Sequence, residues 1–145
     1  MTAGEAVSGL RTWGRGMYAT EAAVELLVRS FGGRFADAGQ PWIRHRPGGY
    51  WLDTDALAEM SGGLSSGERR VLAVVKALAS DRPLDDLPDV LVGVDREQLT
   101  LILAALSHAA GSHQHSLVGR DALTASYYRP GPVVPWPDQA GEVAR

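Results

Sequence analysis

Three of the four histidines in this chain lie in one short segment, at His108, His113 and His115. Neutral imidazole nitrogens bind zinc, copper and nickel, and a turn through Gly111-Ser112 would bring His108 back toward the other two. Histidines two apart in an extended segment also point to the same side. The alternative is a solvated helix end, where the C-terminal dipole stabilises His108. Because the spacing matches no metal-binding signature, we predict no cofactor and keep the three histidines as candidate ligands.

Two pairs of arginines form the second group that could do chemistry. Arg44 and Arg46 lie in a predicted hairpin, and Arg69 and Arg70 lie at the start of a predicted helix. That helix follows a shorter one across a glycine turn, a pattern typical of a helix-turn-helix, whose second helix enters the DNA major groove. The arginines would then contact bases or phosphates, with the hairpin as a wing. The net charge of −3 gives no global electrostatic support for nucleic acid, so DNA binding is the alternative function.

The segment Leu64 to Arg70, with the sequence Leu-Ser-Ser-Gly-Glu-Arg-Arg, resembles the signature loop of ATP-binding-cassette ATPases. The resemblance implies a phosphate at the N-terminus of the helix that begins there. The chain has no G-x-x-x-x-G-K-S/T phosphate loop, and Lys76 is its only lysine. Ser65 and Glu68 also have the spacing of a capping box, in which each side chain bonds the other's backbone amide. We therefore predict a capped helix here and no binding of ATP by the chain alone.

Apolar periodicity and turn residues predict about four helices and one β-hairpin. The helices are expected over 20–31, from Asp53 or Thr54 to Met60, from Ser65 through Leu78, and from Asp95 to Gly111, with one further helical turn over 87–92. Strand-forming residues around a proline-glycine turn predict the hairpin near residues 41–53. Two apolar stripes are expected on the longer helices. Their members are Val71, Val74, Val75 and Leu78 on one, and Leu99, Ile102, Leu103 and Leu106 on the other.

The fold class is therefore mainly α, with three regions along the chain. Residues 1–16 carry four glycines and little periodicity, and we predict a flexible leader there. Residues 17–128 are predicted to form a single helical domain. Residues 129–145 are proline-rich, so we expect an extended C-terminal tail, because proline removes an amide donor and fixes φ.

Aromatic residues make the end of the chain too apolar for a plain spacer. Tyr127, Tyr128 and Trp136 are the candidates for partner binding. Such a segment either packs on its own domain or docks into a partner. We expect packing on the domain, and docking is the alternative.

Composition narrows the function further. The chain has no cysteine, which excludes disulfides, thiolate metal sites and cysteine nucleophiles. No signal peptide is visible and no apolar run is long enough to cross a bilayer, so we expect a cytoplasmic protein without membrane contact. Thirteen arginines against one lysine, without asparagine, indicate a GC-rich bacterial genome. We predict a non-catalytic protein-interaction or assembly subunit that binds a protein partner or itself; a DNA-binding protein and a His-cluster metal-binding protein are the alternatives.

Overall fold

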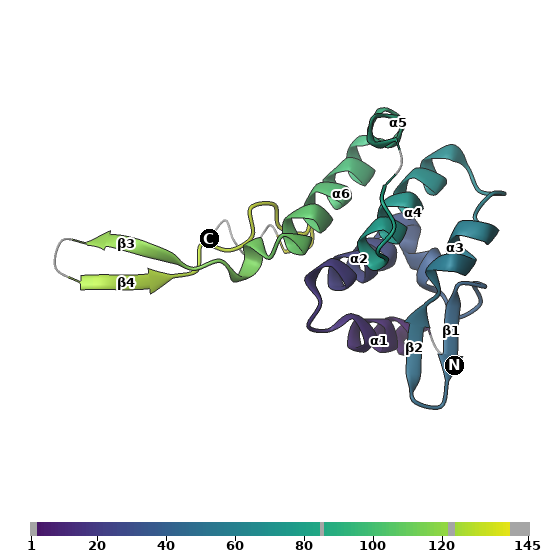
Figure 1. Ribbon diagram of the computed structural model, residues 1–145, viewed down its shortest axis with the longest axis horizontal. Helices are drawn as coiled ribbons and strands as arrows, with labels where there is room; N and C mark the ends of the chain where they lie inside the picture. Colours follow the sequence, from purple (N-terminus) through teal and green to yellow (C-terminus); the bar gives the residue numbers. More distant parts are fainter. Residues whose placement is uncertain (1–2, 85, 122–123, 140–145) are drawn as a thin grey trace.

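The computed structural model describes residues 3–84, 86–121 and 124–139, and within them the chain is mainly α-helical, as predicted (Figure 1). The longer helices are α1 (Ala3–Gly14), α2 (Tyr18–Arg29), α4 (Ser66–Ala79) and α6 (Arg96–Ala109), and the shorter ones are α3 (Thr54–Met60) and α5 (Leu87–Val92). Two 3₁₀ helices, η1 (Ser30–Ala36) and η2 (Ser112–Gln114), and two antiparallel hairpins complete the described part. None of the described helices is long and apolar enough to cross a membrane.

Helix α2 lies at the centre of the fold. Helices α1, α4 and α6 all pack against it. Because it is covered from several sides, its apolar residues extend beyond a single stripe. The buried apolar residues of α2 are Ala22, Ala23, Val24, Leu26 and Leu27. The opposing face of α4 buries Val71, Val74 and Val75 as predicted, together with Leu72, whereas the fourth predicted member, Leu78, is only partly buried. Each such aliphatic side chain contributes about 1.5–3 kcal/mol through burial.

Residues 3–14, within the segment predicted to be a flexible leader, instead form helix α1, which packs on α2 and on the first hairpin. Ala6 and Leu10, one helical turn apart, are fully buried. The glycines hide this pattern because glycine is a poor helix former. Gly9 nevertheless has a packing role. A Cβ atom at Gly9 would lie 2.4 Å from Cδ2 of Tyr50, so glycine lets α1 approach the hairpin this closely.

The helix starts follow the predicted capping residues in three cases. The side chain of Asp53 accepts a hydrogen bond from a backbone amide at the start of α3. Complete capping boxes are present at α4 and α6, formed by Ser65 with Glu68 and by Asp95 with Gln98. Helix α2 differs, since it begins at Tyr18, two residues before the predicted start, and Thr20 is buried inside it. It ends at Arg29, two residues before the predicted end at residue 31, and Gly32 and Gly33 follow with positive φ angles.

The predicted hairpin is confirmed as strands β1 (Ile43–Arg46) and β2 (Gly49–Leu52), with Ile43 opposite Leu52. Both of these residues are buried, and β2 lies against α1. In the turn, Gly48 and Gly49 have φ angles of 121° and 147°, a region that glycine adopts without steric cost.

A second hairpin, which the sequence does not predict, is formed by β3 (Leu117–Asp121) and β4 (Thr124–Tyr128). Figure 1 shows it projecting away from the helices, beyond the C-terminal end of α6. Its two strands contact mainly each other. We call this hairpin the arm, and the helices with the first hairpin the body.

The proline-rich segment after the arm returns to the body. Trp136 is 5 % exposed and belongs to the hydrophobic core. Arg29 of α2 lies over the indole, 4.6 Å from its centroid, and pairs with Asp138 at 3.0 Å. In its described part, to residue 139, the tail therefore packs on its own domain, and Trp136 is not available to a partner.

Candidate functional site

Each face of the arm carries an exposed apolar pair. Leu117 lies opposite Tyr128, and Val118 lies opposite Tyr127. Because neighbouring residues of a strand point to opposite faces, the two pairs lie on opposite faces of the hairpin. Their exposed fractions run from 47 % for Leu117 to 78 % for Tyr127. The two predicted partner-binding tyrosines are therefore accessible, on a two-stranded element that is at best marginally stable alone in water.

The base of the arm is fixed to the end of α6. The hydroxyls of Ser107 and Ser112 lie 2.6 Å apart and both residues are buried. On the returning segment, the amide of Val133 donates to Ser112 Oγ, and the amide of Val134 donates to Ser107 Oγ. The arm thus leaves the body and returns to it at one hydrogen-bonded point.

A row of leucines on α6 is also uncovered by the described chain. Leu99, Leu103 and Leu106 are 36 %, 44 % and 46 % exposed, and their i, i+4, i+7 spacing puts them on one face. We call them the leucine row. The predicted stripe is wrong in this respect, since only Ile102 of its four members is buried. The core side of α6 consists of Leu101, Ile102, Ala104 and Ala105. The helix is apolar around most of its circumference, so periodicity alone could not identify the buried face.

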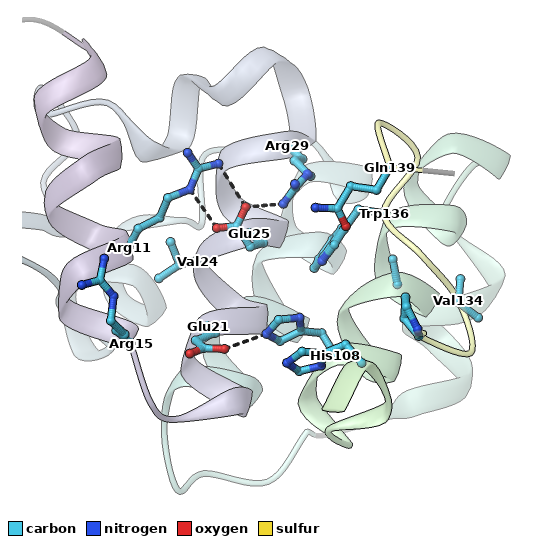
Figure 2. Close-up of a pocket in the computed structure, with 13 residues that line it drawn as sticks. Arg11, Arg15, Glu21, Val24, Glu25, Arg29, His108, Val134, Trp136 and Gln139 are labelled. Carbon is cyan, nitrogen blue, oxygen red and sulfur yellow. Dashed lines mark hydrogen bonds and ion pairs between the residues drawn. The ribbon is translucent and has the colours of Figure 1, made fainter. Parts of the chain in front are cut away.

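Glu21, His108 and His113 come together where α2, the end of α6 and η2 meet, at the wall of a pocket (Figure 2). Nε2 of His108 lies 2.8 Å from Oε1 of Glu21. The imidazoles of His108 and His113 stack 3.9 Å apart with an angle of 11° between their planes, and Tyr18 meets His113 edge-on at 4.9 Å. One donor atom from each of the three residues lies within 4.8 Å of the other two. Two of the predicted histidines are therefore adjacent, whereas His115 is exposed outside the cluster.

The surroundings of the cluster favour a carboxylate and a neutral imidazole. Burial raises the pKa of Glu21, but the hydrogen bond from the Gly16 amide at 2.8 Å and the one with His108 outweigh it, so this pKa lies below its usual value. Burial lowers the pKa of His113, and positive charge on His108 lowers it further. Nδ1 of His113 is buried and, within the described residues, has no hydrogen-bond partner. His113 is thus held in the form that can donate a lone pair.

A network of ion pairs forms another wall of the same pocket, as Figure 2 shows. Arg11 pairs with Glu25 at 2.9 Å, and Arg29 pairs with both Glu25 and Asp138. The hydrogen bond to Glu25 raises the pKa of Arg11, and the hydrogen bond from Arg29 lowers the pKa of Asp138. These carboxylates balance the charge of both guanidinium groups and tie the tail to α2.

The four arginines of the DNA-binding alternative lie on β1 and at the start of α4. Three of them are engaged within the chain: Arg44 pairs with Asp53, Arg46 lies over Trp51, and Arg70 binds Asp89. Arg69 is exposed, and its guanidinium has no partner among the described residues. DNA binding stays a prediction, and Arg69 is the one of the four arginines that forms none of these contacts among the described residues.

Comparison of the chain with protein-family models, with curated proteins and with solved structures finds no match. The candidate sites are therefore assigned from the geometry of this chain. Glu21 is the member of the cluster that the sequence does not single out, because it lies 87 residues from His108. No local spacing connects the two, and only the packing of α2 on α6 brings them together.

Proposed function

We propose that this protein is a non-catalytic assembly subunit that associates with a second copy of itself through the arm and the leucine row. The observation that carries the proposal is the projecting arm, with an exposed aliphatic–aromatic pair on each of its faces. Exposed apolar patches on a folded protein mark interaction sites, and tyrosine is enriched at protein interfaces.

A second copy accounts for both uncovered surfaces at once. In a two-fold dimer every contact occurs twice, so each arm can lie along the leucine row of the partner. The arm follows α6 after only the short η2 turn, and Figure 1 shows it extending beyond the C-terminal end of that helix. The net charge of −3 also gives little long-range repulsion between copies.

Sedimentation of the full chain over a range of concentrations tests the proposal. We expect a concentration-dependent dimer that Leu103→Glu and Tyr127→Ser each convert to monomer without loss of helical circular dichroism. Met60→Glu is the matched control, because Met60 is 51 % exposed on α3, outside both surfaces. This variant should dimerise like the wild type. A single monomeric species at every concentration would contradict self-association, and weakening by Met60→Glu would show that the interface lies elsewhere.

A further inference from the structure

The cluster of Glu21, His108 and His113 combines three groups that bind transition metals (Figure 2). Two imidazoles with one carboxylate suit ions of the zinc class, whereas calcium and magnesium prefer oxygen ligands throughout. The cluster contains no residue of the arm strands or of the leucine row, so metal binding there can be tested separately from the proposed function.

The fold places the three side chains on separate elements that meet at one point. Glu21 lies in the first turn of α2, and His108 lies in the last turn of α6. Gly111, with a φ of 75°, then reverses the chain and returns His113 to His108. A Cβ atom at Gly111 would also lie 3.1 Å from the ring of Tyr18, so this reversal needs glycine for both its conformation and its packing.

The donor atoms are close to the spacing that one ion requires. They lie within 4.8 Å of one another, whereas two donors on a tetrahedral zinc ion, with bonds of about 2.0–2.1 Å, are about 3.3–3.4 Å apart. The donor atoms must therefore approach one another by up to about 1.5 Å. The parallel stacking of His108 and His113 means that their nitrogen lone pairs do not converge as they stand. Binding requires a rotation of the rings, and the ion then replaces the proton shared between His108 and Glu21.

The buried Nδ1 of His113 is a second observation that points to a ligand. A buried nitrogen without a hydrogen-bond partner costs free energy, and among the described residues nothing satisfies it. An ion that contacts this nitrogen would supply the missing partner.

The pocket gives an ion a path from solvent and space for a water ligand. Its volume is about 530 Å³, and Arg11, Arg15 and Trp136 line it beside the cluster. Arg11 is balanced by Glu25, and Arg15 is exposed, so neither places an unscreened positive charge on the cluster. Zinc sites with three protein ligands commonly complete their coordination with water.

We propose that Glu21, His108 and His113 bind one divalent transition-metal ion of the zinc class. The ion connects α2, α6 and η2, and so restrains the segment from which the arm leaves the body.

Zinc titration of the tag-free, chelator-treated full chain by calorimetry near neutral pH tests this site. We expect one ion per chain, bound at micromolar concentration or tighter. His108→Ala, His113→Ala and Glu21→Gln should each weaken binding at least about tenfold. His115→Ala is the matched control, because His115 belongs to the same segment but is exposed outside the cluster, and it should bind like the wild type.

Thermal unfolding separates loss of the site from loss of the fold. Zinc should raise the unfolding midpoint of the wild type and of His115→Ala, because an ion that binds only the native state stabilises it. It should leave the midpoint of a folded His113→Ala or Glu21→Gln variant unchanged. The proposal is overturned if the wild type binds no zinc saturably, or if His115→Ala weakens binding as much as His113→Ala does.

Discussion

Different interactions stabilise the body and the arm. In the body, residues such as Leu26 and Leu27 of α2 are fully buried, and neighbouring helices cover them from several directions. In the arm, the four described aliphatic and aromatic side chains are all at least 47 % exposed, and the strands contact mainly each other. Burial therefore stabilises the body, whereas the described part of the arm is ordered mainly by the hydrogen bonds between its two strands.

This difference separates the parts of the chain that fold by themselves from the part that presents a surface. A long exposed hairpin with unpaired edges is a liability that natural proteins usually cover or protect with charge. Here β3 does include Arg120 and Asp121, but the arm also exposes Leu117, Val118, Tyr127 and Tyr128. We infer that the arm serves to contact another molecule. Substitutions in the body and in the tail can show where the stable body ends.

The largest change in stability is expected at Trp136. This substitution tests whether the tail belongs to the body or to the arm. Trp136→Ala removes a core indole and the ring beneath Arg29, and should lower the free energy of unfolding by about 3–5 kcal/mol. Urea denaturation measures it. Val133→Ala, three residues earlier at an 81 % exposed position, should cost less than about 0.5 kcal/mol. Equal, small losses of stability at both positions would mean that the tail, like the arm, is not part of the stable body.

A smaller effect is expected at Gly9, where α1 touches the first hairpin. Gly9→Ala would place a methyl group 2.4 Å from Cδ2 and 2.9 Å from Cβ of Tyr50, too close to be relieved by rotating the ring alone, and should cost about 1–3 kcal/mol. Gly67→Ala in the first turn of α4 meets nothing nearer than 3.7 Å, so it should be neutral or stabilising by up to about 1 kcal/mol. In urea denaturation, a loss of stability for Gly9→Ala and a gain for Gly67→Ala would confirm the close packing of α1. A gain of stability for both substitutions would contradict it.

Local signals in the sequence were sufficient for most of the body. Some signals act over only three or four residues and can be recognised without knowledge of the fold. They include the capping boxes at Ser65 and Asp95 and the proline-glycine turn of the first hairpin. Helix α1 was missed because its glycines oppose helical propensity, and the reason for Gly9 lies in Tyr50, 41 positions away. A long-range contact has no local signature.

The candidate sites also combine residues that local patterns identify with residues that only long-range contacts bring together. Tyr127 and Tyr128 were candidates for partner binding because they are aromatic and close to the tail. The hairpin that carries them was not predicted, because the segment between β3 and β4 lacks a strong turn signal. Two of the metal candidates were identified from spacing. Glu21 was not, because the pairing of α2 with α6 selects it. Periodicity failed on α6 for a related reason, since a helix that is apolar around most of its circumference does not show which face is buried.

A further prediction concerns a polar contact at the surface of the body. The pKa of Asp53 lies below its usual value, because the hydrogen bond from the Ala56 amide outweighs burial and Arg44 adds to it. The carboxylate therefore stabilises the fold above the unfolded-state pKa of about 3.9, and this contribution is lost as the pH falls through the lower, folded-state pKa. Asp53→Asn keeps the cap but removes the charge, so it should cost about 0.3–1 kcal/mol at neutral pH. In urea denaturation the gap between the two proteins should close below about pH 4, and a gap that persists in acid would contradict this origin.

The smallest free energies are expected in the arm itself, and hydrogen exchange can resolve them. Amides of α2 should exchange only through opening events that approach global unfolding, whereas amides of β3 and β4 in dilute solution should open at almost no cost. Protection in the arm should then rise with protein concentration, because the partner's leucine row covers it, while protection in α2 changes far less. An arm as protected as α2 at the lowest concentration would mean that the hairpin is stable alone and that body and arm do not differ in the source of their order. An arm that stays unprotected at every concentration would mean that a second copy does not cover it, and the same surface would then require a different protein as its partner.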